Sequence, residues 1–292
     1  MNNNISTKDS FINLFNILLL HTSFLLLAFY SINNLGYFAS VPLFILISII
    51  HQKFLGEFIH EGCHYHLFKF KKINEILSNY FVGIFFFVSV QNYRKKHFEH
   101  HKHDEYFKDT DPETGPIKVY SRKEFWKKVL LDLVGINGLK FLLRYTNHEE
   151  EAGKFKTDYN FFLILLLQIV FFVSIFQTKY FLFYLIYYFT LGTLYHLQLR
   201  LRVLGQHLHL EKNKPIQFDK TTSRTIKGGI LEKMFFTSDI TAFHDLHHLH
   251  PYYPYRKLRE IFNKKQMYSN EDENVYTKSR FKFLNNFYKS LN

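Results

Sequence analysis

Two long apolar blocks stand out in the pattern of hydrophobic and polar positions along this chain of 292 residues. Residues 11–50 contain no Lys, Arg, Asp or Glu, and residues 160–199 contain only Lys179. Each block has about 40 residues, twice the roughly 20 that one transmembrane helix needs. Polar breaks at 33–36 and 177–179 divide each block near its middle. The pattern therefore predicts four transmembrane helices in two hairpins, over residues 11–32, 36–54, 159–176 and 180–199.

Almost all charged residues lie outside these blocks, in residues 55–158 and 200–292, which we expect to form a polar helical cap. Residues 80–90 are apolar but too short to cross a bilayer, so they are predicted to be buried or re-entrant. Residues 130–143 have an amphipathic pattern typical of a helix on a membrane surface. The sequence predicts an all-α fold, with residues 1–292 forming one integral membrane domain.

The net charge of +12 is unevenly distributed, because Lys179 is the only basic residue in a predicted hairpin turn. The positive-inside rule then places both termini and the whole cap in the cytoplasm. Basic residues beside anionic lipid headgroups explain the charge, and nucleic-acid binding is not expected because no recognition motif accompanies it. A single cysteine, Cys63, leaves no internal disulfide and fits a reducing compartment.

Eight of the seventeen histidines fall into three tight clusters. The clusters are His60-Glu-Gly-Cys-His64, His97-Phe-Glu-His100-His101 and His244-Asp-Leu-His247-His248. Positions i, i+3 and i+4 share one face of a helix, so each cluster is predicted to project two or three imidazoles in one direction. Imidazole binds Fe, Zn, Cu and Ni, and eight such ligands exceed the four that one tetrahedral zinc takes. The clusters thus predict a centre of two metal ions.

A ninth ligand is expected at the cytoplasmic exit of the fourth predicted helix, where His207 and His209 are both candidates and His207 is preferred. Asp245 lies beside two cluster histidines and could orient an imidazole. His103 and His250 flank the second and third clusters and are weaker candidates for metal binding. The remaining histidines have no neighbour at ligand spacing and are interpreted as structural: His21, His51, His66, His148 and His196.

The first cluster also fits the His-Glu-x-x-His signature of zinc hydrolases, with Glu61 between His60 and His64 as the general base. A membrane zinc metalloprotease is therefore an alternative. A zinc protease needs only one further ligand, however, and would leave both His-x-x-His-His clusters without a purpose. Glu61 has a simpler role as an acceptor that orients a ligand imidazole. A metal transporter is a further alternative, but its ligands would lie along a pathway within the bilayer.

The clusters and their spacing resemble the membrane fatty acid desaturase family, whose members carry three histidine motifs on the cytoplasmic face of a four-helix membrane stalk. The resemblance runs from about residue 40 to about residue 260. It includes the acidic run that ends at Glu113, the sequence Thr-Ser-Arg224-Thr, and the ending His-Pro-Tyr-Tyr-Pro-Tyr255. Arg202-x-x-x-Gln206-His resembles an Arg-x-x-x-Glu-His element of bacterial members. Glutamine replaces the acid there. Gln206 is therefore expected beside the ligands, and its role there is left open.

The resemblance implies a non-haem di-iron centre that uses O₂ to introduce a C=C bond into the acyl chain of a lipid. The iron ligands that it implies are His60, His64, His97, His100, His101, His207, His244, His247 and His248. An acyl or terpenoid hydroxylase or ketolase with the same centre is the alternative, which histidine spacing does not distinguish from a desaturase. The chain has no haem, flavin or ferredoxin motif, so an external ferredoxin-like or cytochrome-like electron donor is expected. The expected location is the bacterial inner membrane, where a multi-pass protein contacts membrane lipids.

Overall fold

The computed structural model describes residues 5–102, 111, 113–146, 158–208, 223–265 and 276–291. Within these ranges the chain is mostly helical, and both strands have only two residues. The predicted all-α class is confirmed. The chain divides into two compact units. We call them the bundle unit, which holds the described residues of 5–93 and 132–196, and the second unit, which holds the described residues of 94–131 and 197–291. The single domain over residues 1–292 stays a prediction.

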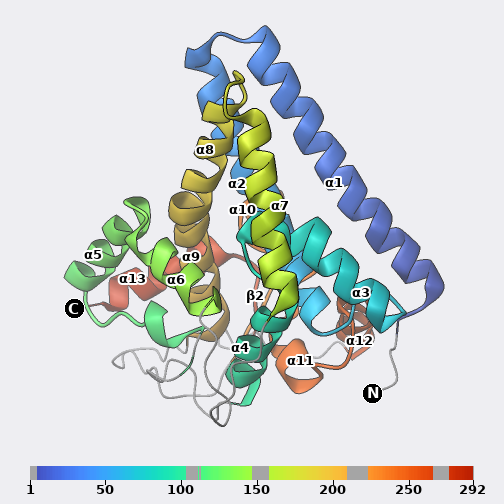
Figure 1. The fold of residues 1–292 in the computed structure, drawn as a ribbon. Coiled ribbons are helices and arrows are strands. Elements are labelled where there is room, and N and C mark those ends of the chain that lie inside the picture. The colour runs from blue at the N-terminus through green and yellow to red at the C-terminus, as the bar shows by residue number, and fades with distance from the viewer. Residues whose placement is uncertain are drawn as a thin grey trace, which may run out of the picture. The chain divides into compact units, whose positions relative to one another are not determined.

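Helices α1 (Thr7–Asn34) and α2 (Tyr37–Cys63) form an antiparallel hairpin in the bundle unit (Figure 1). α1 begins at a capping box, in which the Ser6 side chain accepts from the Asp9 backbone and Asp9 accepts from the Ser6 backbone. Both helices are long and apolar enough to span a membrane. α1 also exposes large apolar side chains such as Leu26, which is 65% exposed, as a helix in lipid would.

Helix α2 extends well past residue 54, where the apolar pattern places its end. Polar side chains follow in this stretch, but they are buried and paired rather than exposed. Lys53 and Glu57 form an ion pair of 3.1 Å one turn apart on the helix. Gly56 lies against Tyr195, because an added Cβ would come within 2.2 Å of its hydroxyl oxygen. The helix therefore continues, and His60 lies in its last turn.

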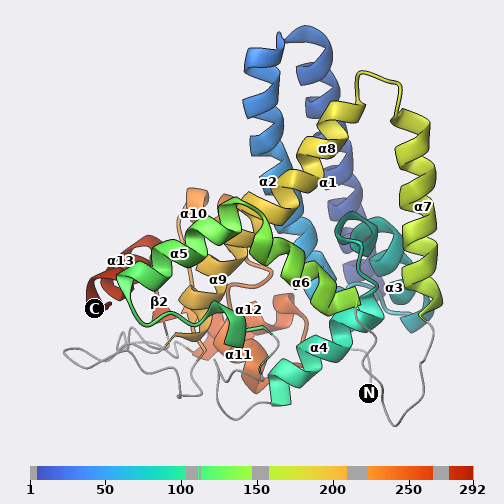
Figure 2. The same cartoon turned by 60° about the vertical axis from the view of Figure 1, so that its left-hand side comes forward.

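Helices α7 (Tyr159–Ile175) and α8 (Phe181–Thr190) form the second predicted hairpin. The turns of both hairpins lie at the same end of the bundle unit (Figures 1 and 2), where the Lys179 ammonium donates a hydrogen bond to the Asn33 side chain. α7 has 17 residues. α8 has only 10, because a π-helical turn, η4 (Leu191–Tyr195), interrupts the fourth predicted helix. Among the described helices taken singly, α1 and α2 have the length and composition of membrane spans. The four-span arrangement stays a prediction.

The apolar stretch over residues 80–90 forms a bend. Its elements and the helix before it are α3 (Lys71–Leu77), the π-helical turn η1 (Ser78–Val82) and the 3₁₀ turn η2 (Gly83–Phe86). Glycine is required at position 83, because a Cβ there would lie 2.4 Å from the carbonyl oxygen of Val88. Phe87 then adopts a left-handed conformation with φ of 54° and ends the turn.

The amphipathic segment predicted over residues 130–143 is divided between two helices. α5 (Arg122–Leu133) is followed by Gly135, whose φ of 83° is left-handed, and α6 (Ile136–Thr146) begins directly after it. α6 packs closely on η4, since a Cβ added to Gly138 would lie 2.0 Å from the carbonyl oxygen of Gly192. Glycine at 135 thus sets a break that the amphipathic pattern alone does not reveal.

A chain of hydrogen bonds crosses the apolar core of the bundle unit. The Tyr187 hydroxyl lies 2.9 Å from Nδ1 of His51, and Nε2 of His51 lies 3.1 Å from Nδ1 of His21. Nε2 of His21 in turn donates to the carbonyl oxygen of Phe81 at 2.8 Å, because a carbonyl only accepts. From their spacing in the sequence, His21 and His51 were interpreted as histidines without neighbouring ligands. In the structure they join α1, α2 and α8 through one polar chain.

The second unit combines short helices with one small parallel strand pair. Besides α5 it contains most of α4 (Val90–Lys102) and α9 (His196–His207), with η3 (Gly115–Ile117), β1 (Thr225–Ile226), α10 (Ile230–Phe235), α11 (His244–Leu249), α12 (Tyr255–Lys265), β2 (Tyr276–Thr277) and α13 (Arg280–Ser290). An apolar cluster packs α9 against α13 through Leu204 and Phe287. A second cluster packs α11 against α12 through Leu246 and Leu258. α11 ends just before Pro251, as the proline predicts.

Gly138→Ala is expected to destabilise the bundle unit, because the new methyl group would press on backbone rather than on a flexible side chain. Overpacking of this kind costs about 1–3 kcal/mol, so the midpoint of thermal unfolding in detergent should fall by several degrees. Gly192→Ala, on the other side of the same contact, is the matched control, because a Cβ there meets nothing within 4 Å. Equal midpoints for Gly138→Ala and wild type would contradict the close packing of α6 on η4.

Candidate metal centre

The three cluster histidines of α4 point to two different places. His97 and His101 lie one turn apart, and their Nε2 atoms are 3.0 Å from each other. His100 turns to another side of the helix, because successive residues of an α-helix are about 100° apart. Its Nδ1 lies 3.0 Å from a carboxylate oxygen of Asp111. The motif thus serves two groups of ligands rather than one.

Helix α11 divides its histidines in the same way. Nε2 of His248 lies 3.2 Å from Nε2 of His244, which is one turn earlier. His247 faces α4 instead, where its Nε2 lies 3.1 Å from Nε2 of His101. Each His-x-x-His-His motif therefore projects two of its imidazoles together, as expected, and the third in another direction.

The first set of converging ligands is the four-histidine group, which consists of His100, His207, His244 and His248. One ring nitrogen of each residue lies within 4.8 Å of those of the others. Nε2 of His207 lies 2.7 Å from Nε2 of His244. The His100 ring lies edge-on to those of His207 and His248, with centroid distances of 4.8 and 5.1 Å. Three helices of the second unit, α4, α9 and α11, supply this group.

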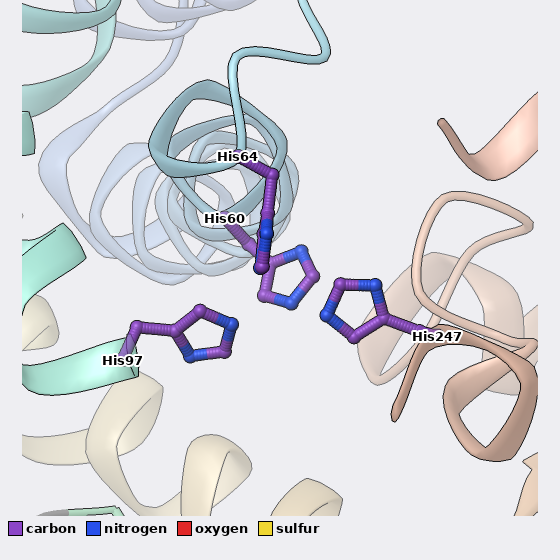
Figure 3. Close-up of side chains that lie close together, drawn as sticks. All are labelled: His60, His64, His97 and His247. Carbon is purple, nitrogen blue, oxygen red and sulfur yellow. The ribbon is translucent and has the colours of Figure 1, made fainter. Parts of the chain in front are cut away.

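The second set is the three-histidine group, which consists of His97, His101 and His247. Nε2 of His101 lies close to both partners, at 3.0 Å from His97 and 3.1 Å from His247. The rings of His97 and His247 lie side by side in nearly parallel planes, with centroids 6.1 Å apart (Figure 3). All three residues belong to the second unit.

The bundle unit contributes a separate pair of histidines at the end of α2. His60 lies in the last turn and His64 directly follows the helix, with ring centroids 5.3 Å apart (Figure 3). Gly62 between them packs on Ser78, since an added Cβ would lie 2.4 Å from the serine hydroxyl oxygen. The close packing at Gly62 fixes the backbone that presents both imidazoles.

Two carboxylates orient the imidazoles of α4. Nδ1 of His100 donates to Asp111, and Nδ1 of His97 donates to Glu113 at 2.7 Å. Asp111 is itself held by the backbone N–H groups of Glu113 and Thr114, at 2.9 and 3.2 Å, and by the Thr114 hydroxyl. A carboxylate on one ring nitrogen fixes the tautomer and leaves the other nitrogen for a metal. The sequence analysis assigned neither acid a role at the site, and the acidic run that follows the second cluster was the available signal.

The ionisation states also suit a metal centre. Burial, with the neighbouring His100, holds the pKa of His207 well below its ordinary value, and burial with His244 does the same for the pKa of His248. Burial would raise the pKa of Glu113, but the His97 imidazole outweighs it and lowers that pKa to about 2. At neutral pH these imidazoles are therefore neutral, the form that binds metal, and the carboxylate is ionised.

Glu61 lies where the sequence places it, beside the first pair. Its buried carboxylate oxygens are 3.4 Å from Nδ1 of His60 and 3.7 Å from Nδ1 of His66. His66 was interpreted as isolated, but its ring stacks on that of His64 at 5.4 Å. Tyr65 causes this arrangement, because its left-handed φ of 62° turns the chain back after α2. A single positive-φ residue is not visible in the sequence.

The other predicted neighbours of the ligands contact protein groups around the site. Gln206 donates from Nε2 to the carbonyl oxygen of Thr241 at 3.0 Å, so it joins α9 to the segment before α11. Asp245 accepts a hydrogen bond from the Thr225 hydroxyl. Nδ1 of His250 lies 3.3 Å from the Tyr252 hydroxyl. His103, His148 and His209 lie outside the described residues.

The comparison with protein families decides the affiliation of the chain. The model of the fatty acid desaturase family matches residues 36–277, a range that holds all nine predicted ligands. The chain belongs to the fatty acid desaturase family. A search of curated proteins gave no match. Membership in the desaturase family supports an oxidoreductase that acts on fatty acyl substrates and is bound to a membrane.

The donor set fits the iron centre that the desaturase family implies. The four-histidine group offers only imidazole nitrogens, which bind iron well and can leave positions open for other ligands. Its Nε2 atoms converge on one another, and a carboxylate outside the group holds His100 from behind. Hydrogen bonds among the imidazoles alone would explain this convergence less well than a shared metal ion does.

Asp111→Asn is expected to weaken metal binding by about ten- to a hundred-fold, the usual cost of losing a carboxylate behind a ligand histidine. The amide keeps the shape but removes the charge that supports His100. Titration of the purified metal-free protein with Co²⁺, against a chelator, measures the change. Asp239→Asn is the control, because this acid of the second unit pairs with Lys233 at 2.7 Å. An unchanged affinity in Asp111→Asn would contradict the orienting role.

Proposed function

We propose that this protein is a membrane desaturase that removes two hydrogen atoms from an acyl chain of a lipid, with O₂ as co-substrate and two irons held by nine histidines. The desaturase family supports this class of reaction in general. One observation carries the specific proposal: imidazoles from three distant stretches of sequence, residues 97–101, 207 and 244–248, converge within the second unit.

We assign one iron to the four-histidine group and the other to the three-histidine group. We also propose His60 and His64 as iron ligands, because the resemblance to the desaturase family implies them. The pair at the end of α2 belongs to the same family match and has Glu61 beside it as an orienting acceptor. His207 is our choice for the ninth ligand, supported by its 2.7 Å distance to His244.

The bound metals supply the oxidising power for breaking an unactivated C–H bond, which side chains lack. The residues of the chain do the rest. Asp111 and Glu113 hold His100 and His97 in one tautomer, and burial keeps water away from the ligand nitrogens. The apolar helices of the bundle unit offer an acyl chain an environment like that of the lipid around it.

Electrons for the reaction must come from outside the chain. Reduction of O₂ to water takes four electrons, of which the substrate gives two, so a donor provides the other two. We propose a separate ferredoxin-like or cytochrome-like protein, because the sequence contains no motif for haem, flavin or an iron–sulfur cluster. The basic character of the chain would attract an acidic partner.

We further propose a multi-pass protein of the bacterial inner membrane, with α7 and α8 crossing the bilayer beside α1 and α2. The shared end of the two hairpin turns, joined by Lys179 and Asn33, supports this arrangement. Basic residues are concentrated away from that end in the sequence, which supports cytoplasmic termini and a cytoplasmic location for the histidine motifs.

An acyl or terpenoid hydroxylase or ketolase is the second candidate, because it would use the same ligands. The two activities differ in the product: desaturation removes two hydrogen atoms, whereas hydroxylation adds one oxygen atom. The zinc metalloprotease that the His-Glu-x-x-His signature allows differs in the metal it binds, zinc rather than iron.

The proposal is tested by mass spectrometry of the lipids of cells that express the protein. We expect acyl chains that have lost two hydrogen atoms, and we expect His97→Ala, His101→Ala and His248→Ala each to abolish this product while the protein still inserts in the membrane. His250→Ala is the matched control, because it lies in the same segment but contacts Tyr252. Full activity in any of the three variants would refute its ligand role, and oxygenated products would favour the second candidate.

A further inference from the structure

Arg224 is a buried arginine whose donors are directed at the end of α9. It is 1% exposed, and its guanidinium donates from Nη1 to the carbonyl oxygen of Gly205 at 2.8 Å and from Nη2 to that of Leu208 at 3.1 Å. Its backbone N–H donates to the carbonyl oxygen of Gln206 at 2.7 Å. These three carbonyl groups surround His207, a member of the four-histidine group, on both sides along the chain.

Elementary electrostatics explains why an arginine is held here. The last carbonyl groups of a helix lack partners within the helix and form the negative end of its dipole. A buried guanidinium loses its hydration, and this loss is offset by those carbonyls and by the Phe283 ring, 3.8 Å away. The planar fork of arginine reaches two acceptors at once, which the single ammonium of lysine does not do in the same geometry.

The residues after Arg224 are bound to the segment that leads into α11. The backbone N–H of Ile226 donates to the carbonyl oxygen of Ala242 at 3.0 Å, and Thr225 pairs with Phe243 in an antiparallel bridge. The Thr225 hydroxyl also donates to Asp245, the second residue of α11. Both Thr225 and Ile226 are buried. Residues 224–226 therefore contact the end of α9 with one residue and the start of α11 with the next two.

We infer that Arg224 is a positioning residue for metal binding, acting through residues 224–226 as a brace between His207 and His244. The brace holds the end of α9 against the start of α11 and so sets the 2.7 Å separation between the Nε2 atoms of these ligands. Gln206 adds a second connection through Thr241. The inference rests on the proposed metal centre, since it gives Arg224 a role in that centre.

The test compares Co²⁺ binding by purified full-length wild type, Arg224→Lys and Thr225→Val, followed by the visible absorption of the bound cobalt. Arg224→Lys keeps the charge but loses the fork, so affinity should fall about ten-fold or more and the absorption spectrum should change. Thr225→Val keeps the shape, removes the bond to Asp245, and should weaken binding less. Helix content by circular dichroism should stay at the wild-type level in both variants.

Arg280→Lys is the matched control. Arg280 is also 1% exposed in the second unit, and its guanidinium donates to the Thr237 hydroxyl and lies 5.7 Å from the Phe236 ring. We expect this variant to lower thermal stability while the cobalt affinity and spectrum stay those of wild type. A general structural role of buried arginines would change both variants alike.

The outcomes separate the inference from the proposed function. Wild-type affinity and spectrum in both Arg224→Lys and Thr225→Val would overturn the brace while leaving the metal centre in place. An equal loss of affinity in Arg280→Lys would overturn it as well. Failure of the wild-type protein to bind cobalt or iron would instead overturn the proposed metal centre. If Arg224→Lys unfolds, Thr225→Val decides alone, and an unchanged spectrum in that variant overturns the brace.

Discussion

The candidate centre depends on one constraint: seven imidazoles of the second unit must stay neutral and buried with their Nε2 atoms turned toward shared points. An imidazolium has no lone pair to give a metal, and several charges in so small a volume would repel one another. Burial lowers the pKa of His207 and of His248 and so meets the first requirement for these two ligands, whereas the hydrogen bond to Asp111 outweighs burial and raises the pKa of His100. Hydrogen bonds at Nδ1, from His97 to Glu113 and from His100 to Asp111, meet the second.

The scaffold of the second unit supplies this arrangement from short elements. Its helices within the described residues are short, so their positions follow from tertiary packing and from caps rather than from helical propensity. Leu246 and Leu258 join α11 to α12, and Leu204 and Phe287 join α9 to α13. Arg224 closes the end of α9, where the helix dipole favours a cation. Ligand geometry and fold stability therefore rest on many of the same contacts.

Much of the fold could be predicted from the sequence, because it follows from the absence of charge over long stretches. The first and third predicted spans agree with α1 and α7 within a few residues. The end of α2 could not be predicted, because the burial of Lys53 and Glu57 as a pair is a tertiary property that their charges conceal. Gly135 and the π-helical turn after α8 likewise divide segments whose composition reads as continuous.

The candidate ligands could be proposed from the sequence, but their arrangement could not. Spacing singled out the cluster histidines, and position at a helix end singled out His207, because both signals are local. Each His-x-x-His-His motif is divided between two groups according to what packs opposite each face of its helix. Residues 97–101 and 244–248 contact each other, so this division can be seen only in the folded structure. The proposed roles of Asp111 and Arg224 depend on hydrogen bonds to residues that are 11 and 16 positions away in the sequence. No motif spacing in the sequence predicts these contacts.

X-ray absorption at the iron edge of the purified, iron-loaded protein tests the central claim most directly. Several imidazoles on each iron produce a recognisable scattering pattern from the outer atoms of the rings, with nitrogen and oxygen as nearest neighbours. Loss of part of that pattern in His244→Ala, and of a comparable part in His247→Ala, would agree with two groups that share α11. A protein that holds no iron, or iron whose surroundings show no imidazole scattering, would contradict the proposed centre.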